Sequence, residues 1–151
     1  MSRIMLVAAA AALLVGAPAW AADHEVKMMN KGAAGTMVFE PAYLAIAPGD
    51  TVTFKAINPA HNAESIPGMV PEGAQPFKTP LSKDHTVTFE KEGLYGYKCM
   101  PHYGMGMVGL VQVGKAAPNA GKAAAVNHPG KAKERMAALI TEAAKVVAAA
   151  N

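Results

Sequence analysis

Alternation of polar and apolar residues predicts short β-strands over much of the chain. Thr51–Phe54 and Thr86–Phe89 alternate in this way, as strands with one buried face do. A run rich in β-branched residues covers 108–113, and weaker strand patterns occupy His24–Met29, Thr36–Phe39 and Tyr43–Ile46. Turn-forming residues separate these runs at Lys31-Gly32, Pro48-Gly49-Asp50, Pro67-Gly68 and Glu92-Gly93. Many short strands with such turns indicate an antiparallel sandwich or barrel.

After Gly114 the pattern becomes helical. Pro118 and Asn119 can open a short helix through Ala125, and the alanine-rich stretch from Lys131 to Ala149 predicts a longer one. The apolar residues of the longer stretch fall on one helical face: Met136, Leu139, Ile140, Ala143 and Val147. Because few of them are large, this face suits packing against the sandwich better than contact with a membrane surface. We therefore expect a helical tail over residues 118–150.

The first 21 residues have the features of a secretory signal peptide. Arg3 precedes an apolar run from Ile4 to Val15, and Ala19-Trp20-Ala21 has the form that signal peptidase accepts. The run is too short to span a membrane, and no comparable run follows it. We therefore expect an exported chain that begins at Ala22 and forms one domain over residues 22–151.

Charge argues against nucleic acid as a partner. The full chain carries 14 basic and 11 acidic side chains, and removal of residues 1–21 takes away only Arg3 from this count. The remaining excess is small and no dense basic run is present.

Cys99 is the only cysteine, and it stands in the stretch YGYKCMPHYGMGMVG of residues 95–109. A lone cysteine cannot form an internal disulfide, and in an oxidising compartment it needs protection, which a bound metal would give. His102 and Met107 follow within one loop, so thiolate, imidazole and thioether can meet at one point. Two histidines, one cysteine and a weak axial methionine describe a blue-copper electron-transfer site.

Such a site needs a second histidine from elsewhere in the chain. His61 is the best candidate because it follows a predicted strand, in the loop Asn58-Pro59-Ala60-His61-Asn62. His24 stands at the start of the mature chain, His85 begins a strand, and His128 lies between the two predicted helices. For the methionine, Met105 and Met107 share strand parity, so alternation alone leaves the choice between them open.

The stretches NPAHNAES and GLYGYKCMPHYGMGMVGLVQV, followed by two alanine- and lysine-rich helices, resemble the pseudoazurins, a group within the blue-copper cupredoxin family. The resemblance covers essentially the whole mature chain. It implies a Greek-key cupredoxin β-sandwich of about eight strands with two C-terminal α-helices. It also implies one copper ion per chain, cycling between Cu(I) and Cu(II), with the ligands His61, Cys99, His102 and Met107.

The resemblance also assigns supporting residues. The backbone amide of Asn30 should approach the thiolate sulfur, and Asn62 should help to orient the site. The residue after the cysteine is commonly threonine in pseudoazurins but is Met100 here, so any hydrogen bond from that hydroxyl is missing.

Four protein ligands would leave no open position for a substrate, which favours electron transfer over catalysis. An enzyme with Cys99 as nucleophile would leave Met107 unexplained. A copper storage or delivery protein is the remaining alternative, but Met28, Met29, Met69 and Met105 are scattered rather than clustered.

The resemblance implies a soluble periplasmic protein that donates electrons to an acidic reductase of denitrification, and a monomer is the default expectation. Copper nitrite reductase is the first candidate for this partner and nitrous oxide reductase the second, whereas the electron donor stays unidentified. The partner would meet an apolar patch around His102, ringed by lysines. The predicted docking residues are Met37, Pro80, Pro101, Tyr103 and Met105 in the patch, with Lys31, Lys78 and Lys98 around it.

Overall fold

The computed structural model describes residues 20–150, so the predicted signal peptide lies almost entirely outside the described residues. The strands are β1 (Asp23–Gly32), β2 (Gly35–Glu40), β3 (Tyr43–Ile46), β4 (Thr51–Ala56), β5 (Glu64–Ser65), β6 (His85–Thr88), β7 (Gly93–Lys98) and β8 (Val108–Val113). A 3-10 helix, η1 (Met100–Met105), separates β7 from β8, and the chain ends in α1 (Ala120–Ala124) and α2 (Ala132–Ala149). Among these described residues no helix is long and apolar enough to cross a membrane.

The eight strands form two four-stranded sheets, which confirms the predicted sandwich. The strand orders are β2-β1-β4-β6 and β3-β8-β7-β5. The β1–β4 and β3–β8 pairs are parallel, so the expected antiparallel pairing holds only for the other strand pairs. Parallel neighbours arise here because the chain crosses from one sheet to the other between them.

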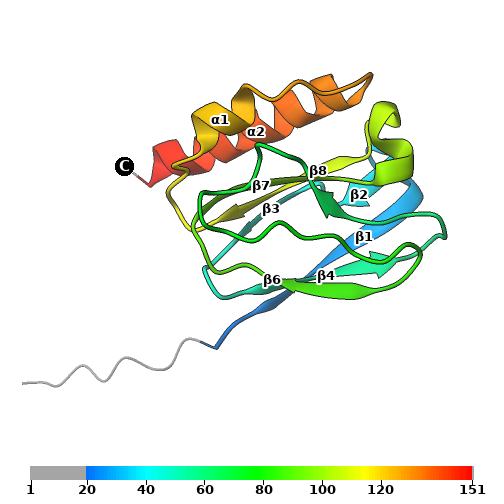
Figure 1. Ribbon diagram of the computed structural model, residues 1–151, viewed down its shortest axis with the longest axis horizontal. Coiled ribbons are helices and arrows are strands. Elements are labelled where there is room, and N and C mark those ends of the chain that lie inside the picture. The colour runs from blue at the N-terminus through cyan, green and yellow to red at the C-terminus, as the bar shows by residue number, and fades with distance from the viewer. Residues whose placement is uncertain (1–19, 151) are drawn as a thin grey trace, which may run out of the picture.

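Both helices cover the outer face of the second sheet, where β7, β8 and β3 lie (Figure 1). The sheet is therefore buried on both sides. Odd-numbered residues of β7 and β8, such as Tyr95 and Val111, face the first sheet, while Leu94 and Leu110 pack under the helices. Met136 and Ala143 of α2 are fully buried in that second core, as the helical spacing predicted.

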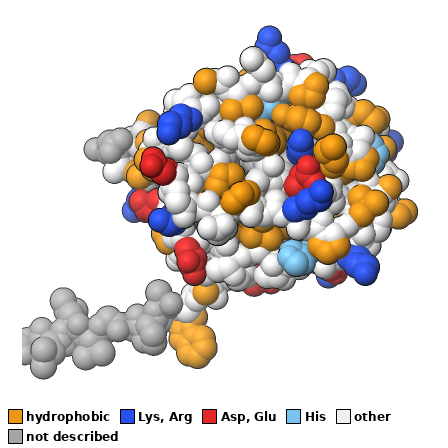
Figure 2. All heavy atoms as spheres, viewed as in Figure 1, with side chains coloured by type: hydrophobic (Ala, Val, Ile, Leu, Met, Phe, Trp, Pro, Cys, Tyr) orange, Lys and Arg blue, Asp and Glu red, His pale blue; other side chains and the backbone are white. Residues whose placement is uncertain are grey.

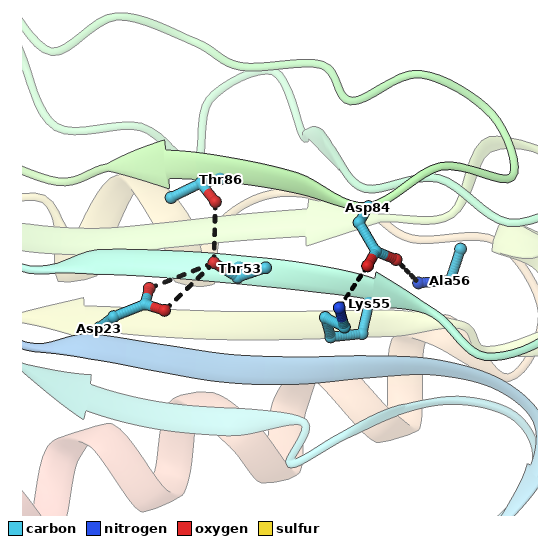
Figure 3. A network of polar contacts seen from close by, with 6 residues as sticks. All are labelled: Asp23, Thr53, Lys55, Ala56, Asp84 and Thr86. Atoms are coloured by element: carbon cyan, nitrogen blue, oxygen red, sulfur yellow. Dashed lines mark hydrogen bonds and ion pairs between the residues drawn. The ribbon is translucent and has the colours of Figure 1, made fainter.

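Side-chain contacts tie the strands of the first sheet together on its outer face (Figure 3). The hydroxyl of Thr53 in β4 lies 2.8 Å from the Thr86 hydroxyl and donates to Asp23 Oδ1 at 3.2 Å. Lys55 forms an ion pair with Asp84, which precedes β6. These contacts hold β4 between its neighbours, and β4 leads directly into the loop that carries His61.

The predicted turn at Lys31-Gly32 is wrong by two residues. Both residues belong to β1, and the turn falls at Ala33 and Ala34. A Cβ atom at Gly32 would collide with the Glu40 carboxylate and with Val38, so a larger residue here would displace both side chains. That carboxylate accepts a hydrogen bond from the Ala33 amide at 3.0 Å and so closes the hairpin.

Candidate metal centre

His61, Cys99 and His102 meet at one end of the sandwich. Their candidate ligand atoms lie within 4.8 Å of one another. The two Nδ1 atoms are 3.2 Å apart, and Cys99 Sγ is 3.6 Å from His61 Nδ1 and 3.4 Å from His102 Nδ1. The second histidine inferred for the site is therefore His61, while Tyr103 holds His128 and Asp50 holds His24.

Backbone hydrogen bonds close the ligand loop on itself. The Cys99 amide donates to the Met107 carbonyl at 3.0 Å, and the Met107 amide donates to the His102 carbonyl at 3.2 Å. Pro101 stands in the first turn of η1, where its missing N–H costs nothing, and Gly106 ends the helix with φ at +93°. The expected glycine-rich loop thus contains a 3-10 helix, which turns His102 back toward Cys99.

Burial separates the two methionines that strand parity could not. Met107 is fully buried in the same core cluster as Cys99. Met105 ends η1 with 48 % of its surface exposed. Met107 is thus the methionine enclosed beside the donor cluster, whereas Met105 points to the surface.

Asn30 supports the site through its side chain. Its Oδ1 lies 2.7 Å from His61 Nε2, so it accepts the proton of that ring nitrogen and leaves Nδ1 as the free donor atom. Its backbone amide donates to Asn58 Oδ1 at 2.8 Å. The predicted contact between this amide and the sulfur is therefore wrong, because Asn58 occupies the amide.

Asn62 influences both Cys99 and the residue that follows it, Met100. Its side-chain Oδ1 accepts a hydrogen bond from the Met100 amide at 2.9 Å. The His102 backbone amide donates to the Cys99 carbonyl at 3.2 Å, and the backbone groups of Asn62 and His102 lower the pKa of the Cys99 thiol. The departure from threonine at Met100 therefore leaves the backbone anchoring of this position intact.

The protonation state of the cluster suits a metal. Burial lowers the pKa of His61, and the neighbouring His102 lowers it further, so the ring is held neutral with Nδ1 unprotonated. Burial raises the pKa of the Cys99 thiol, against the opposing hydrogen bonds from Asn62 and His102, and the charge of Glu64 raises it too. A thiolate here needs a cation beside it, which a coordinated metal provides.

The distances fit one first-row metal ion. Bonds of about 2.0 Å to nitrogen and 2.3 Å to sulfur place ligand atoms roughly 3.3–3.7 Å apart. The three observed separations span 3.2–3.6 Å. Thiolate and imidazole with a buried thioether beside them are the donors that copper prefers. The cluster therefore fits a single copper ion.

The predicted docking residues lie around the same end. Pro101 and Met105 are exposed on η1, and Tyr103 is half-buried beside His102. Pro80 is exposed in a segment whose Ser82 amide donates to the His61 carbonyl at 2.8 Å. Met37 is half-buried in the β1–β2 hairpin, which also carries the exposed Lys31. Figure 2 shows apolar side chains gathered along the right-hand margin, the end at which Figure 1 draws η1.

Glu64 is a charged neighbour of the site that the sequence did not reveal. Its carboxylate lies 3.6 Å from Lys78 Nζ and 3.8 Å from Lys98 Nζ, and Asn62 Nδ2 donates to it at 3.1 Å. Lys98 also lies over the Tyr103 ring, 4.8 Å from its centroid. Two of the three predicted steering lysines are thus partly neutralised by one acid, a pairing between strands that no local pattern indicates.

A Greek-key sandwich with a His-Cys-His cluster and an enclosed methionine at one end defines a blue-copper cupredoxin. The family profile of copper-binding proteins of the plastocyanin/azurin family matches residues 26–114. Pseudoazurin of Paracoccus pantotrophus is 51% identical over 91% of this chain and 95% of its own. Pseudoazurin of Methylorubrum extorquens is 42% identical over 93% and 96%.

Solved structures of pseudoazurins are also similar to this chain. A pseudoazurin structure from Methylobacterium extorquens superposes with a TM-score of 0.77 at 43% identity, covering 80% of this chain and 98% of that one. The pseudoazurin of Hyphomicrobium denitrificans gives 0.76 at 47% identity with the same coverage. The chain therefore belongs to the pseudoazurins, blue-copper electron carriers within the plastocyanin/azurin family.

Proposed function

We propose that this protein carries single electrons in the periplasm, with copper held by His61, Cys99, His102 and, as axial ligand, Met107. The observation that carries the proposal is the cluster of two Nδ1 atoms and one sulfur within 3.6 Å, with Met107 enclosed beside it. Copper supplies the one-electron redox step when it is bound. The chain's own part is to hold one ligand geometry for both oxidation states.

The route for the electron is the edge of His102. His61, Cys99 and Met107 are each 0% exposed, whereas His102 is half-buried, so it alone of the four brings the site to the surface. The exposed apolar residues Pro101 and Met105 flank it and suit brief contact with a partner.

The partner we propose is an acidic reductase of denitrification, copper nitrite reductase in the first place and nitrous oxide reductase in the second. Lys31, Lys78 and Lys98 around the patch would attract an acidic surface over a distance. We further propose that the protein acts as a monomer.

Export rests on the signal peptide pattern, with cleavage after Ala21. The Ala22 nitrogen donates to Asp50 Oδ1 at 2.9 Å, and Asp50 is 6% exposed. A chain that begins at Ala22 would place its α-ammonium group beside this carboxylate, a favourable ion pair at the start of β1. N-terminal sequencing of the protein recovered from the periplasmic fraction tests both the compartment and the cleavage site.

A visible absorption spectrum tests the central proposal. The purified, copper-loaded protein should show an intense blue thiolate band that disappears on reduction and returns on oxidation. Mixing the reduced protein with copper nitrite reductase and nitrite should restore the band by turnover. A copper storage protein would bind copper without the band, and a cysteine enzyme would need no copper, so either result overturns electron transfer.

A further inference from the structure

The segment that enters α2 touches the ligand loop at three places. His128 Nδ1 forms a hydrogen bond of 2.7 Å with the Tyr103 hydroxyl. The Lys131 amide donates to the Gly104 carbonyl at 3.1 Å. Arg135 Nη1 then donates to the Gly106 carbonyl at 2.9 Å. In Figure 1 the connection between α1 and α2 lies beside η1, at the end of the sandwich that holds the metal centre. The helical tail therefore braces the loop between His102 and Met107.

Arg135 also reaches a second support of the site. Nη1 donates to the Met37 carbonyl at 2.9 Å, and both Nη atoms donate to the Thr36 carbonyl at 3.2 Å. The guanidinium thus joins the β1–β2 hairpin to the ligand loop. Among residues 20–150 no carboxylate forms an ion pair with it, and its side-chain hydrogen bonds go to the backbone carbonyls of Thr36, Met37 and Gly106. A planar fork with five donors suits this task, and an ammonium group does not.

Gly106 links the Arg135 hydrogen bond to the candidate metal ligand Met107. It directly precedes Met107, and its φ of +93° belongs to the left-handed region. A Cβ atom at Gly106 would lie 2.9 Å from Arg135 Cδ and 3.0 Å from Lys131 Cβ, so helix and loop pack closely. An axial thioether bond to copper is long and weak. The protein scaffold, rather than the bond, must then define where the Met107 sulfur lies.

We propose that Arg135 is a positioning residue of the metal centre, which fixes the Gly106 carbonyl and with it Met107 relative to the β1–β2 hairpin. The proposal rests on the proposed copper site. It assigns a function to the helical tail, since α2 delivers to the ligand loop a guanidinium that the sandwich itself does not provide.

The test uses the full chain with Arg135→Lys, Arg135→Met and the control Lys133→Met, an exposed neighbour on α2. In the copper-free proteins, amide hydrogen exchange at Met107 is measured by NMR. Loss of hydrogen bonds from a charged donor should speed this exchange by about tenfold in both Arg135 variants. The control should match the wild type. If the Met107 amide exchanged at the same rate in the wild type and all three variants, the proposal for Arg135 would be wrong. That result would not affect the proposed copper site.

The copper-loaded proteins supply the second readout. Both Arg135 variants should change the relative intensities of the visible thiolate bands, since the axial sulfur then samples more than one position. If Arg135→Lys keeps the wild-type spectrum and exchange rate while only Arg135→Met shifts the reduction potential, Arg135 acts by charge and the proposal is wrong. A wild-type protein without a blue band would instead refute the proposed function, and the exchange data would still stand. Circular dichroism confirms that each variant is folded.

Discussion

The choice between Met107 and Met105 as axial ligand can be tested with two matched substitutions, Met107→Leu and Met105→Leu. Leucine fills nearly the same volume as methionine but has no sulfur. At the fully buried Met107 such a swap should cost less than about 1.5 kcal/mol of unfolding free energy. At Met105, 48 % exposed, the cost should stay within about 0.5 kcal/mol. Both proteins should therefore fold, and differences at the metal report on coordination.

The expected magnitude follows from the strength of the axial bond. If the thioether stabilises the oxidised ion tenfold more than the reduced ion, its loss raises a one-electron reduction potential by about 59 mV. We expect Met107→Leu to raise the potential by tens of millivolts and to alter the thiolate bands while copper stays bound. Met105→Leu should leave both unchanged.

Cyclic voltammetry and visible spectroscopy of the two variants at one pH and ionic strength decide the matter. Equal shifts in the two variants, or a shift confined to Met105→Leu, would refute the assignment of Met107. Unfolding of both variants in guanidinium chloride, without copper, checks that the estimated losses of stability are met and that neither result comes from a damaged fold.

Three further predictions concern charge and stability. Lys78→Glu should slow association with copper nitrite reductase and flatten its dependence on ionic strength in stopped-flow measurements, whereas Lys122→Glu, on α1 far from the ligand loop, should not. Tyr97→Phe should raise the unfolding free energy by about 1–2 kcal/mol, because the buried Tyr97 hydroxyl has no hydrogen-bond partner among the described residues. Denaturant titration measures this change. A loss of stability would show that the hydroxyl does form a hydrogen bond. Asp50→Asn should destabilise the protein at neutral pH, because the contact with His24 and the amide contacts lower the pKa of Asp50. That stability is fully present above about pH 4 and is lost as pH falls through the lowered pKa, so the difference between wild type and variant should shrink in acid denaturation curves.

The sequence predicted most elements because their patterns reflect burial on one face. Thr51–Phe54 alternates as expected, and Val52 and Phe54 are fully buried in β4. In β7 and β8 nearly every residue is buried, since helices cover the face that water would otherwise reach. Two-residue β5 and the 3-10 helix η1 could not be predicted, because β5 is defined by its pairing with β7 and η1 by the closure of the ligand loop.

The metal centre was predictable to the extent that its residues are close in sequence. Cys99, His102 and Met107 belong to one loop, and their spacing already indicated a soft-donor site. His61 could be inferred only because a second imidazole was required. Asn30 with His61, Glu64 with Lys98 and Arg135 with Gly106 join segments far apart in the chain, so no spacing could reveal these contacts.

The supports of the centre come from separate parts of the fold, and this bears on electron transfer. His61 is oriented by Asn30 from β1, whereas Cys99 and Met107 are locked together by the β7–β8 connection. Each of these hydrogen bonds joins two protein groups, so the ligands are held by contacts that do not include the metal. A copper ion bound there would be held by ligands whose positions the protein scaffold sets. If this scaffold keeps the ligands in place in both oxidation states, little rearrangement would accompany each electron. Such a fold would favour fast one-electron exchange over a ligand geometry that is optimal for only one oxidation state of copper.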